Sequence, residues 1–256
     1  MSVKKIIFLN QKGGVGKTTT AVNLGSSLAQ MGNKVLLVDL DAQGNLTSAV
    51  SGDNRINGTY EVIVGQCPAT EACQKTSIQN LYVMGANINM AGLNIELVDQ
   101  EMRESFLKKA LAPLEDQWDY ILADCPPSLG LVTMNAMCWA QYVIIPMQCE
   151  YFAMEGLNLL MRTISNIKKS LNPSLQVLGI LFTMYVKRTK LANDVVEDIS
   201  SYFSSLVFST LIPRNVRIAE APSHGLPINV YDMQCSGAKA YQKLAQEVVK
   251  RVAKFE

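Results

Sequence analysis

The chain has 256 residues, of which 48% are hydrophobic and 18% charged, and its formal net charge is +1. These values fit a globular α/β protein with a sizeable core and exclude a strongly basic or acidic chain, although a local basic patch would still suffice to bind nucleic acid. The sequence has no apolar run of about eighteen residues or more, which excludes a membrane span, and no signal-peptide pattern, so the cytoplasm is the expected compartment.

Cysteine and histidine usage excludes two further classes of protein. The single histidine is His224, so a multi-histidine metal site is excluded. Six cysteines are spread without a C-x-x-C pair, which indicates buried free thiols and no disulfide framework: Cys67, Cys73, Cys125, Cys138, Cys149 and Cys235.

The predicted elements alternate between strands and helices along the chain. Strands are expected over residues 5–9, 34–38, 81–84, 120–123, 143–146 and 177–183, with a short one near Val207. Helices are expected over residues 18–31, 101–114, 154–171, 190–203 and 237–255, and residues 52–90 otherwise as short helices and loops. Repeated βα units predict one domain over residues 1–256: a mostly parallel, twisted sheet with helices on both faces and ligands at the carboxyl ends of the strands.

A glycine-rich loop lies between the first predicted strand and the first predicted helix. Its Gly16-Lys17-Thr18 sequence is the core of a P-loop. Lys17 is expected to reach the β- and γ-phosphates, and the Thr18 hydroxyl to bind Mg²⁺. Backbone N–H groups of the loop and the helix N-terminus would cradle the phosphates, so the expected nucleotide-binding residues here are Gly13, Gly14, Val15, Gly16, Lys17, Thr18 and Thr19.

The loop departs from the generic P-loop pattern at two positions. Gln11 stands where the first glycine is usual, and Lys12 adds a second lysine. A second cation needs nearby negative charge, so its simplest role is a second phosphate contact, either in its own site or across a dimer. The competing dinucleotide-binding fingerprint fails because Thr19 stands where glycine or alanine is required.

Three aspartates follow predicted strands at the expected ligand-binding edge. Asp39 and Asp41 come at the end of the second strand and Asp124 directly after the strand at 120–123. Carboxylates placed there can hold hydrated Mg²⁺ and orient an attacking water. Asp124 has the Walker B arrangement, an apolar strand ending in an acid.

Five sequence blocks together resemble the ParA/Soj partition ATPases, and the resemblance covers nearly the whole chain. The blocks are KGGVGKT at 12–18, DLDAQGN at 39–45, DCPPS at 124–128, IPRNVR at 212–217 and EAPS at 220–223. The last two distinguish the chain from the wider group that includes MinD and the nitrogenase iron protein.

The resemblance implies an ATP-sandwich dimer with defined roles for the site residues. Lys12, Lys17 and Asp41 would be catalytic: Lys12 would reach the nucleotide of the partner subunit, and Asp41 would position the hydrolytic water. Asp39 and Asp124 would serve Mg²⁺ together with Thr18. The adenine would lie near Thr183, Met184, Pro213 and Asn215.

The resemblance also implies partners. The ATP-bound homodimer would bind duplex DNA without sequence preference, a ParB-type protein would stimulate slow hydrolysis, and ADP-bound monomers would leave the nucleoid. The candidate DNA contacts are Lys187, Arg188, Lys190, Arg214 and Arg217. Ala42 replaces the family's usual proline, and Lys187 stands where Asp-Gly is frequent. With no DNA-reading domain before the P-loop, the chain resembles the short, Soj-like members.

Other functions compete with chromosome or plasmid partition. A MinD-like membrane ATPase would need a basic amphipathic helix at its tail, whereas the apolar stripe from Tyr241 to Phe255 indicates packing against the sheet, and no membrane is expected. A related ATPase that positions a protein cargo stays open. An iron–sulfur donor would need cysteines placed to bridge a cluster between subunits, and Cys125 is not evidence of that. Asp41 argues against a binding module without hydrolysis.

Overall fold

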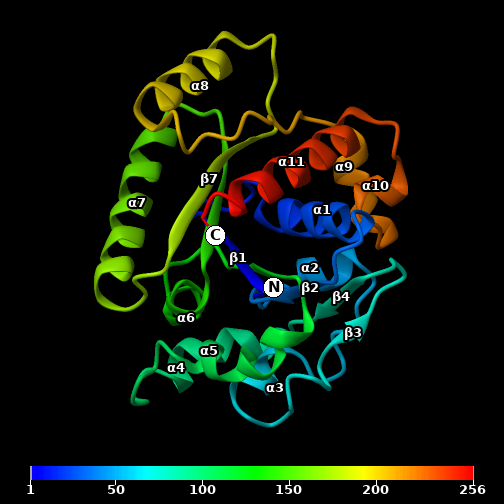
Figure 1. The fold of residues 1–256 in the computed structure, drawn as a ribbon, viewed down its shortest axis with the longest axis vertical. Helices are drawn as coiled ribbons and strands as arrows, with labels where there is room; N and C mark the ends of the chain where they lie inside the picture. Colours follow the sequence, from blue (N-terminus) through cyan, green and yellow to red (C-terminus); the bar gives the residue numbers. More distant parts are fainter. Residues whose placement is uncertain (1, 256) are drawn as a thin grey trace.

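Seven strands form one sheet at the centre of the computed structural model, which describes residues 2–255. The strand order is β3-β4-β2-β5-β1-β6-β7 (Figure 1). Each neighbouring pair is parallel except β3 with β4, which is antiparallel. The predicted α/β class with a mostly parallel sheet is therefore confirmed.

The strands are short, and most are buried on both faces. Their bounds are β1 Lys4–Phe8, β2 Val35–Asp39, β3 Gln74–Lys75, β4 Leu81–Met84, β5 Tyr120–Asp124, β6 Tyr142–Gln148 and β7 Gln176–Thr183. Every residue of β2 and of β5 is buried. Strands covered by helices on both faces consist of consecutive apolar residues, and this pattern made these segments recognisable in the sequence.

Helices cover both faces of the sheet (Figure 1). One face packs against α1 and α11 and the other against α5, α6 and α7. The helices are α1 Lys17–Gln30, α2 Asn45–Ala49, α3 Thr59–Ile63, α4 Leu93–Glu96, α5 Phe106–Leu111, α6 Leu131–Trp139, α7 Ala153–Ser170, α8 Lys190–Phe203, α9 Val216–Glu220, α10 Ile228–Tyr231 and α11 Ser236–Val252. Short 3₁₀ segments span Ile88–Gly92, Ala112–Gln117 and Ala221–His224.

Three local predictions differ from the structure. The helix expected over 101–114 is α5 alone, followed by a 3₁₀ segment with Pro113 in its first turn. Proline lacks the N–H that would continue an α-helix. The helix α6 was not predicted, because nearly all of its residues are buried and it shows no polar face. Val207 forms only an isolated bridge to Ile180.

The C-terminal apolar stripe is part of the core. Tyr241, Leu244, Val248 and Val252 are buried in the cluster that joins α1, α11 and the sheet, as predicted. Phe255 differs, since it is half-exposed and its ring lies 5.7 Å from that of Tyr142. Across residues 2–255, none of the helices combines the length and apolar character that spanning a membrane requires.

Candidate nucleotide site

The glycine-rich loop leaves β1 at the centre of the sheet, between β5 and β6, and leads into α1. Gly14 and Gly16 have left-handed φ values of +73° and +87°. Side chains other than glycine rarely adopt this conformation, so both positions require glycine. A β-carbon on Gly16 would lie 3.6 Å from Cγ2 of Thr183, an ordinary contact distance, so the left-handed φ and not crowding is the reason for glycine there. The loop therefore follows a path set by its glycines.

Lys17 is buried at the start of α1, among acidic groups. Its Nζ donates to the carbonyl oxygen of Lys12 at 3.3 Å. Burial lowers the pKa of Lys17, while Asp124, Cys125 and Asp41 oppose that shift through their charges. The carboxylates favour the charged form of this buried amine, and an ammonium group is what an anionic ligand would contact.

Thr18 and Asp124 form the centre of the acidic side of the site. The Thr18 hydroxyl donates to Oδ2 of Asp124 at 2.5 Å. Oδ1 of Asp124 is buried and has no hydrogen-bond partner among residues 2–255. Burial raises the pKa of Asp124 to about 8, with the charge of Asp39 adding to the effect. An orphaned carboxylate oxygen beside a threonine hydroxyl suits a divalent cation.

Asp39 lies opposite Asp124 on the neighbouring strand, in register with it. Its Oδ2 accepts from the backbone N–H and the hydroxyl of Thr47, at 2.9 and 2.7 Å, and its Oδ1 accepts from the N–H of Asp41 at 3.1 Å. Burial raises its pKa to about 6 against these hydrogen bonds. The observed contacts tie β2 to α2, and the metal role of Asp39 stays a prediction.

Asp41 begins the turn after β2. Its Oδ1 accepts from the N–H of Gln43 at 3.0 Å, and its carbonyl accepts from the N–H of Gly44 at 2.9 Å. The residue is half-buried. Among the described residues, no group of three or more His, Cys, Asp and Glu side chains could hold a metal. A cation beside Thr18 and Asp124 would therefore need phosphate or water oxygens as further ligands.

A cavity of 480 Å³ adjoins the start of α1. The four residues predicted to surround adenine all line it, together with Gly16 and Thr19: Thr183, Met184, Pro213 and Asn215. The Thr183 hydroxyl is bound to the loop, since Oγ1 lies 2.7 Å from the carbonyl oxygen of Val15. Phosphate loop and cavity are thus one continuous site.

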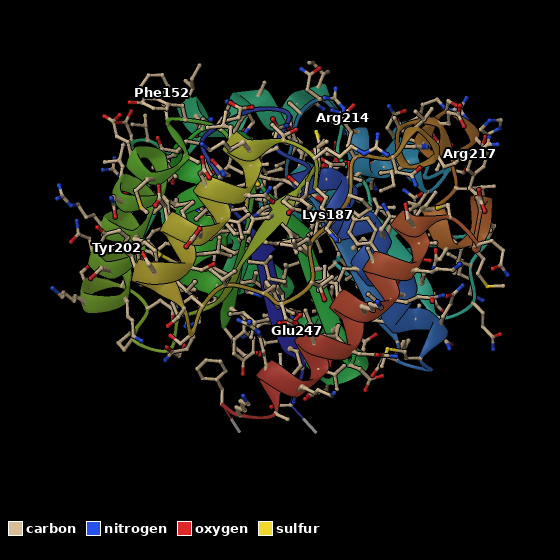
Figure 2. All side chains as sticks on the ribbon, turned by 90° about the horizontal axis from the view of Figure 1, so that it is seen from above. Phe152, Lys187, Tyr202, Arg214, Arg217 and Glu247 are labelled. Atoms are coloured by element: carbon tan, nitrogen blue, oxygen red, sulfur yellow. The ribbon has the colours of Figure 1, made fainter. Side chains whose placement is uncertain are left out.

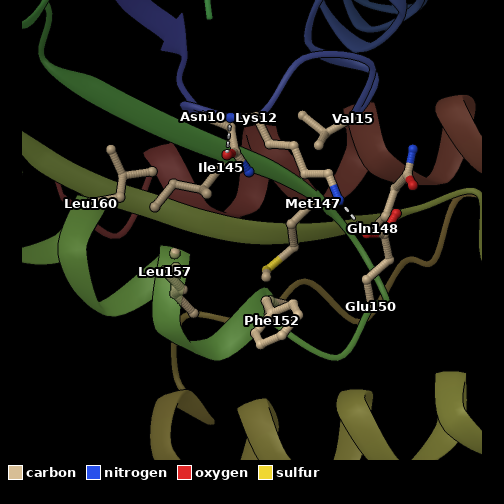
Figure 3. A pocket seen from close by; sticks show the side chains of 12 residues that line it. Asn10, Lys12, Val15, Ile145, Met147, Gln148, Glu150, Phe152, Leu157 and Leu160 are labelled. Carbon is tan, nitrogen blue, oxygen red and sulfur yellow. Dashed lines mark hydrogen bonds and ion pairs between the residues drawn. The ribbon is translucent and has the colours of Figure 1, made fainter. Parts of the chain in front are cut away.

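The end of β6 forms the other wall of the loop (Figure 3). Asn10 donates from Nδ2 to the carbonyl of Pro146 at 2.8 Å, and Lys12 forms an ion pair with Glu150. Gln148 donates from Nε2 to the carbonyl of Gly14 at 2.9 Å. Gln148 and Glu150 were not predicted as site residues, although a place at or just after the end of a buried strand is the signal that identified Asp39 and Asp124.

Comparison with known proteins identifies the family. The family model AAA_31, described as an AAA domain, matches residues 3–177. The chain is 51% identical to the chromosome-partitioning ATPase Soj of Treponema pallidum over 97% of this chain and 98% of that protein. It is 48% identical to the sporulation initiation inhibitor protein Soj of Bacillus subtilis over 96% of this chain and 98% of that protein. The chain belongs to the ParA/Soj family.

A solved structure extends the likeness beyond partition proteins. Cobyrinic acid a,c-diamide synthase from Mycobacterium smegmatis, with bound ATP analog and magnesium, superposes with a TM-score of 0.88 at 35% identity, over 99% of this chain and 97% of that one. The same fold therefore occurs in proteins with other names, and the ParA/Soj assignment rests on sequence identity.

The basic residues that the ParA/Soj resemblance marks for DNA come from two segments. Lys187, Arg188 and Lys190 are exposed just before or at the start of α8. A parallel bridge between Tyr185 and Pro213 brings this segment beside the one that carries Arg214 and Arg217, both also exposed.

Arg217 differs from the other basic residues in its partners. It pairs with Glu220 at 3.0 Å and with Asp232 at 3.7 Å. In Figure 2, Arg214 and Arg217 lie toward one edge of the molecule and Lys187 nearer the centre. All five basic side chains are thus exposed, and Arg217 is the one with carboxylate partners among the described residues.

Proposed function

We propose that this chain is a slow, partner-stimulated partition ATPase. In this proposal Mg-ATP drives formation of a sandwich homodimer that binds duplex DNA without sequence preference, and a ParB-type protein stimulates the hydrolysis that releases it. The observation that carries the proposal is the convergence of Lys17, Thr18 and Asp124, with its orphaned Oδ1, at the loop of a ParA/Soj family member.

ATP and Mg²⁺ are the nucleotide and metal of the proposed activity. Residues 13–19 would hold the phosphates, and Thr18 and Asp124 the cation, which neutralises phosphate charge when bound. Lys17 supplies a buried positive charge for the phosphate oxygens. Asp41 has one carboxylate oxygen engaged with Gln43 N–H, leaving the other to orient a water.

The exposure of Lys12 supports the dimer in this proposal. Its side chain is 58% exposed, whereas Lys17 is buried. Lys12 is therefore the lysine that can reach a nucleotide bound to a second subunit. Asp41→Ala should trap the ATP-bound dimer, which size-exclusion chromatography with light scattering would detect. Lys17→Ala is the control, since it should bind no nucleotide and stay monomeric; a purely monomeric Asp41→Ala with Mg-ATP would contradict the sandwich.

The DNA partner is supported by the exposed basic segments at 187–190 and 214–217. Binding of a random duplex and of anionic liposomes should be compared with ATP, with ADP and without nucleotide. We expect ATP-dependent DNA binding and no liposome binding, and a ParB-type protein should accelerate hydrolysis. Equal DNA binding in all three states would refute the nucleotide switch, and ATP-dependent liposome binding would favour the MinD-like alternative. The protein would then be cytoplasmic and nucleoid-associated in its ATP state.

A further inference from the structure

Gln148 is the last residue of β6, and its side-chain amide contacts two parts of the candidate site. Nε2 lies 2.9 Å from the carbonyl oxygen of Gly14 in the loop and 3.1 Å from Sδ of Met184 in the cavity wall. The amide group has two hydrogens, so it can donate to both at once. Gln148 therefore joins the phosphate loop to the cavity that was predicted to take the base.

The contact to Gly14 fixes the orientation of one peptide group. In a trans peptide the C=O and the following N–H point in opposite directions. Holding the Gly14 carbonyl against Gln148 therefore turns the Val15 N–H away from β6. Thr183 acts in a similar way on the next peptide. Its one hydroxyl hydrogen has two acceptors, the Val15 carbonyl at 2.7 Å and the Met147 carbonyl at 3.1 Å, and the shorter contact orients the Gly16 N–H.

These two anchors come from neighbouring positions in the sheet. Gln148 and Thr183 are register partners at the ends of β6 and β7. Consecutive peptides of the loop are thus each held by a side chain from an adjacent strand. This pairing gives the two N–H groups a common orientation, as a phosphate cradle needs.

Packing holds the loop at Val15, whose side chain is buried, but not at the two glycines before it. A β-carbon built on Gly13 or on Gly14 would meet no atom within 4 Å. A glycine segment with open space around it has many conformations, and fixing each residue costs about 1–2 kcal/mol in entropy. The hydrogen bond from Gln148 is therefore the contact that orients the Gly14 carbonyl, while the buried Val15 side chain anchors the other end of the peptide.

We propose that Gln148 is a positioning residue for nucleotide binding, one that presets the Gly14–Val15 peptide for a phosphate. The inference rests on the proposed function, because it requires a nucleoside di- or triphosphate at the loop. Gln148 need not touch the reacting atoms. Its substitution should therefore lower the affinity for ATP and ADP more than it lowers kcat.

The test uses Gln148→Met, which keeps the length of the side chain and removes both donors, and Gln148→Glu as a second variant without the amide. Thermal unfolding establishes that each is folded. Binding of ATP, ADP and adenosine is measured by calorimetry, together with hydrogen exchange of the Val15 amide and with kcat and KM. The matched control is Gln79→Met, at an exposed glutamine before β4.

We expect Gln148→Met to weaken ATP and ADP binding about two- to tenfold, the effect of one lost hydrogen bond, with adenosine binding and kcat nearly unchanged and faster exchange at Val15. Gln79→Met should match the unaltered protein. If the unaltered protein binds ATP and both Gln148 variants bind it equally well, the inference is overturned. Failure of the unaltered protein to bind ATP would instead refute the proposed function.

Discussion

The hydroxyl of Thr18 donates a 2.5 Å hydrogen bond to Oδ2 of Asp124, joining the first turn of α1 to the end of β5. Because the hydroxyl proton is directed at Asp124, the lone pairs of Oγ1 remain available to a cation. Oδ1 of Asp124, which lacks a partner among the described residues, is the second available oxygen. Metal binding should therefore depend on both side chains.

Thr18→Val tests this dependence. The variant should bind ATP in EDTA like the unaltered protein and lose about tenfold or more of the affinity that Mg²⁺ adds, because one oxygen ligand is removed. Titrations of ATP with and without Mg²⁺ measure this difference. Thr18→Ser is the matched control and should retain the ATP affinity that Mg²⁺ adds. If Thr18→Val retained all of that added affinity, the hydroxyl would not be a ligand.

The stability of the metal-free protein should fall as pH rises toward 8. Burial raises the pKa of Asp124 from its ordinary 3.8 to about 8. Between these values the folded protein binds a proton that the unfolded chain has released. The contribution of Asp124 to the free energy of unfolding is therefore most favourable below pH 3.8 and declines up to about pH 8. The raised pKa of Asp39, about 6, acts in the same direction.

Thermal unfolding in EDTA between pH 5 and 9 checks the sign, and Asp124→Asn should flatten much of the dependence. A midpoint that rises over this range in the unaltered protein and equally in Asp124→Asn would contradict the assignment.

Glu150→Gln should favour the ATP-bound dimer. The ion pair between Lys12 and Glu150 must open before Lys12 can reach a partner's nucleotide, and a half-exposed pair of this kind contributes about 0.2–1 kcal/mol. Removing it should strengthen ATP-dependent dimerisation by about two- to fivefold, as measured by analytical ultracentrifugation.

Glu155→Gln, at an exposed position of α7, is the control and should have no effect. Salt should narrow the difference between Glu150→Gln and the unaltered protein, since it screens the pair. Weaker dimerisation of Glu150→Gln would instead mean that Glu150 is needed within the dimer.

Arg188→Ala and Arg217→Ala should weaken DNA binding in different ways. Arg188 is exposed, and its replacement should remove about one phosphate contact. The slope of log affinity against log salt concentration should then become shallower by about one. Arg217 already pairs with Glu220 and Asp232, and it sits on α9, which lines the cavity through Val216 and Ile218. Arg217→Ala should therefore also change ATP affinity, whereas Arg188→Ala should not.

DNA titrations at two salt concentrations, with ATP calorimetry, distinguish the two effects. Glu220→Gln supplies the converse variant, because freeing Arg217 from one carboxylate should strengthen DNA binding. Unchanged DNA binding in both arginine variants would remove this surface from the proposal.

The elements that carry the phosphate site could be predicted because their chemistry is local in sequence. Gly16, Lys17 and Thr18 follow one another, and Asp124 ends an apolar strand, so their placement needed only the rule that parallel strands end at one edge. The cavity residues Thr183 and Pro213 were located through the family resemblance, and they do line one cavity with Gly16.

What could not be predicted depends on contacts between distant segments. The pairing of Lys12 with Glu150, and of Arg217 with Asp232, joins residues whose spacing follows no period. The engagement of Thr183 with the Val15 carbonyl is likewise invisible in sequence. A buried helix such as α6 is also missed by periodicity, because it has no polar face to reveal its pitch.

The central position of β1 gives its loop two chemically different neighbours. On one side β5 contributes the charged carboxylate of Asp124, and on the other β6 contributes the neutral amide of Gln148. Among residues 2–255, no hydrogen bond or ion pair joins these two side chains, so the losses of ATP affinity caused by substituting Asp124 and Gln148 should add when the substitutions are combined. Ion dependence and loop geometry would then be two properties that evolution or an engineer can adjust separately, one on each flank of the same strand.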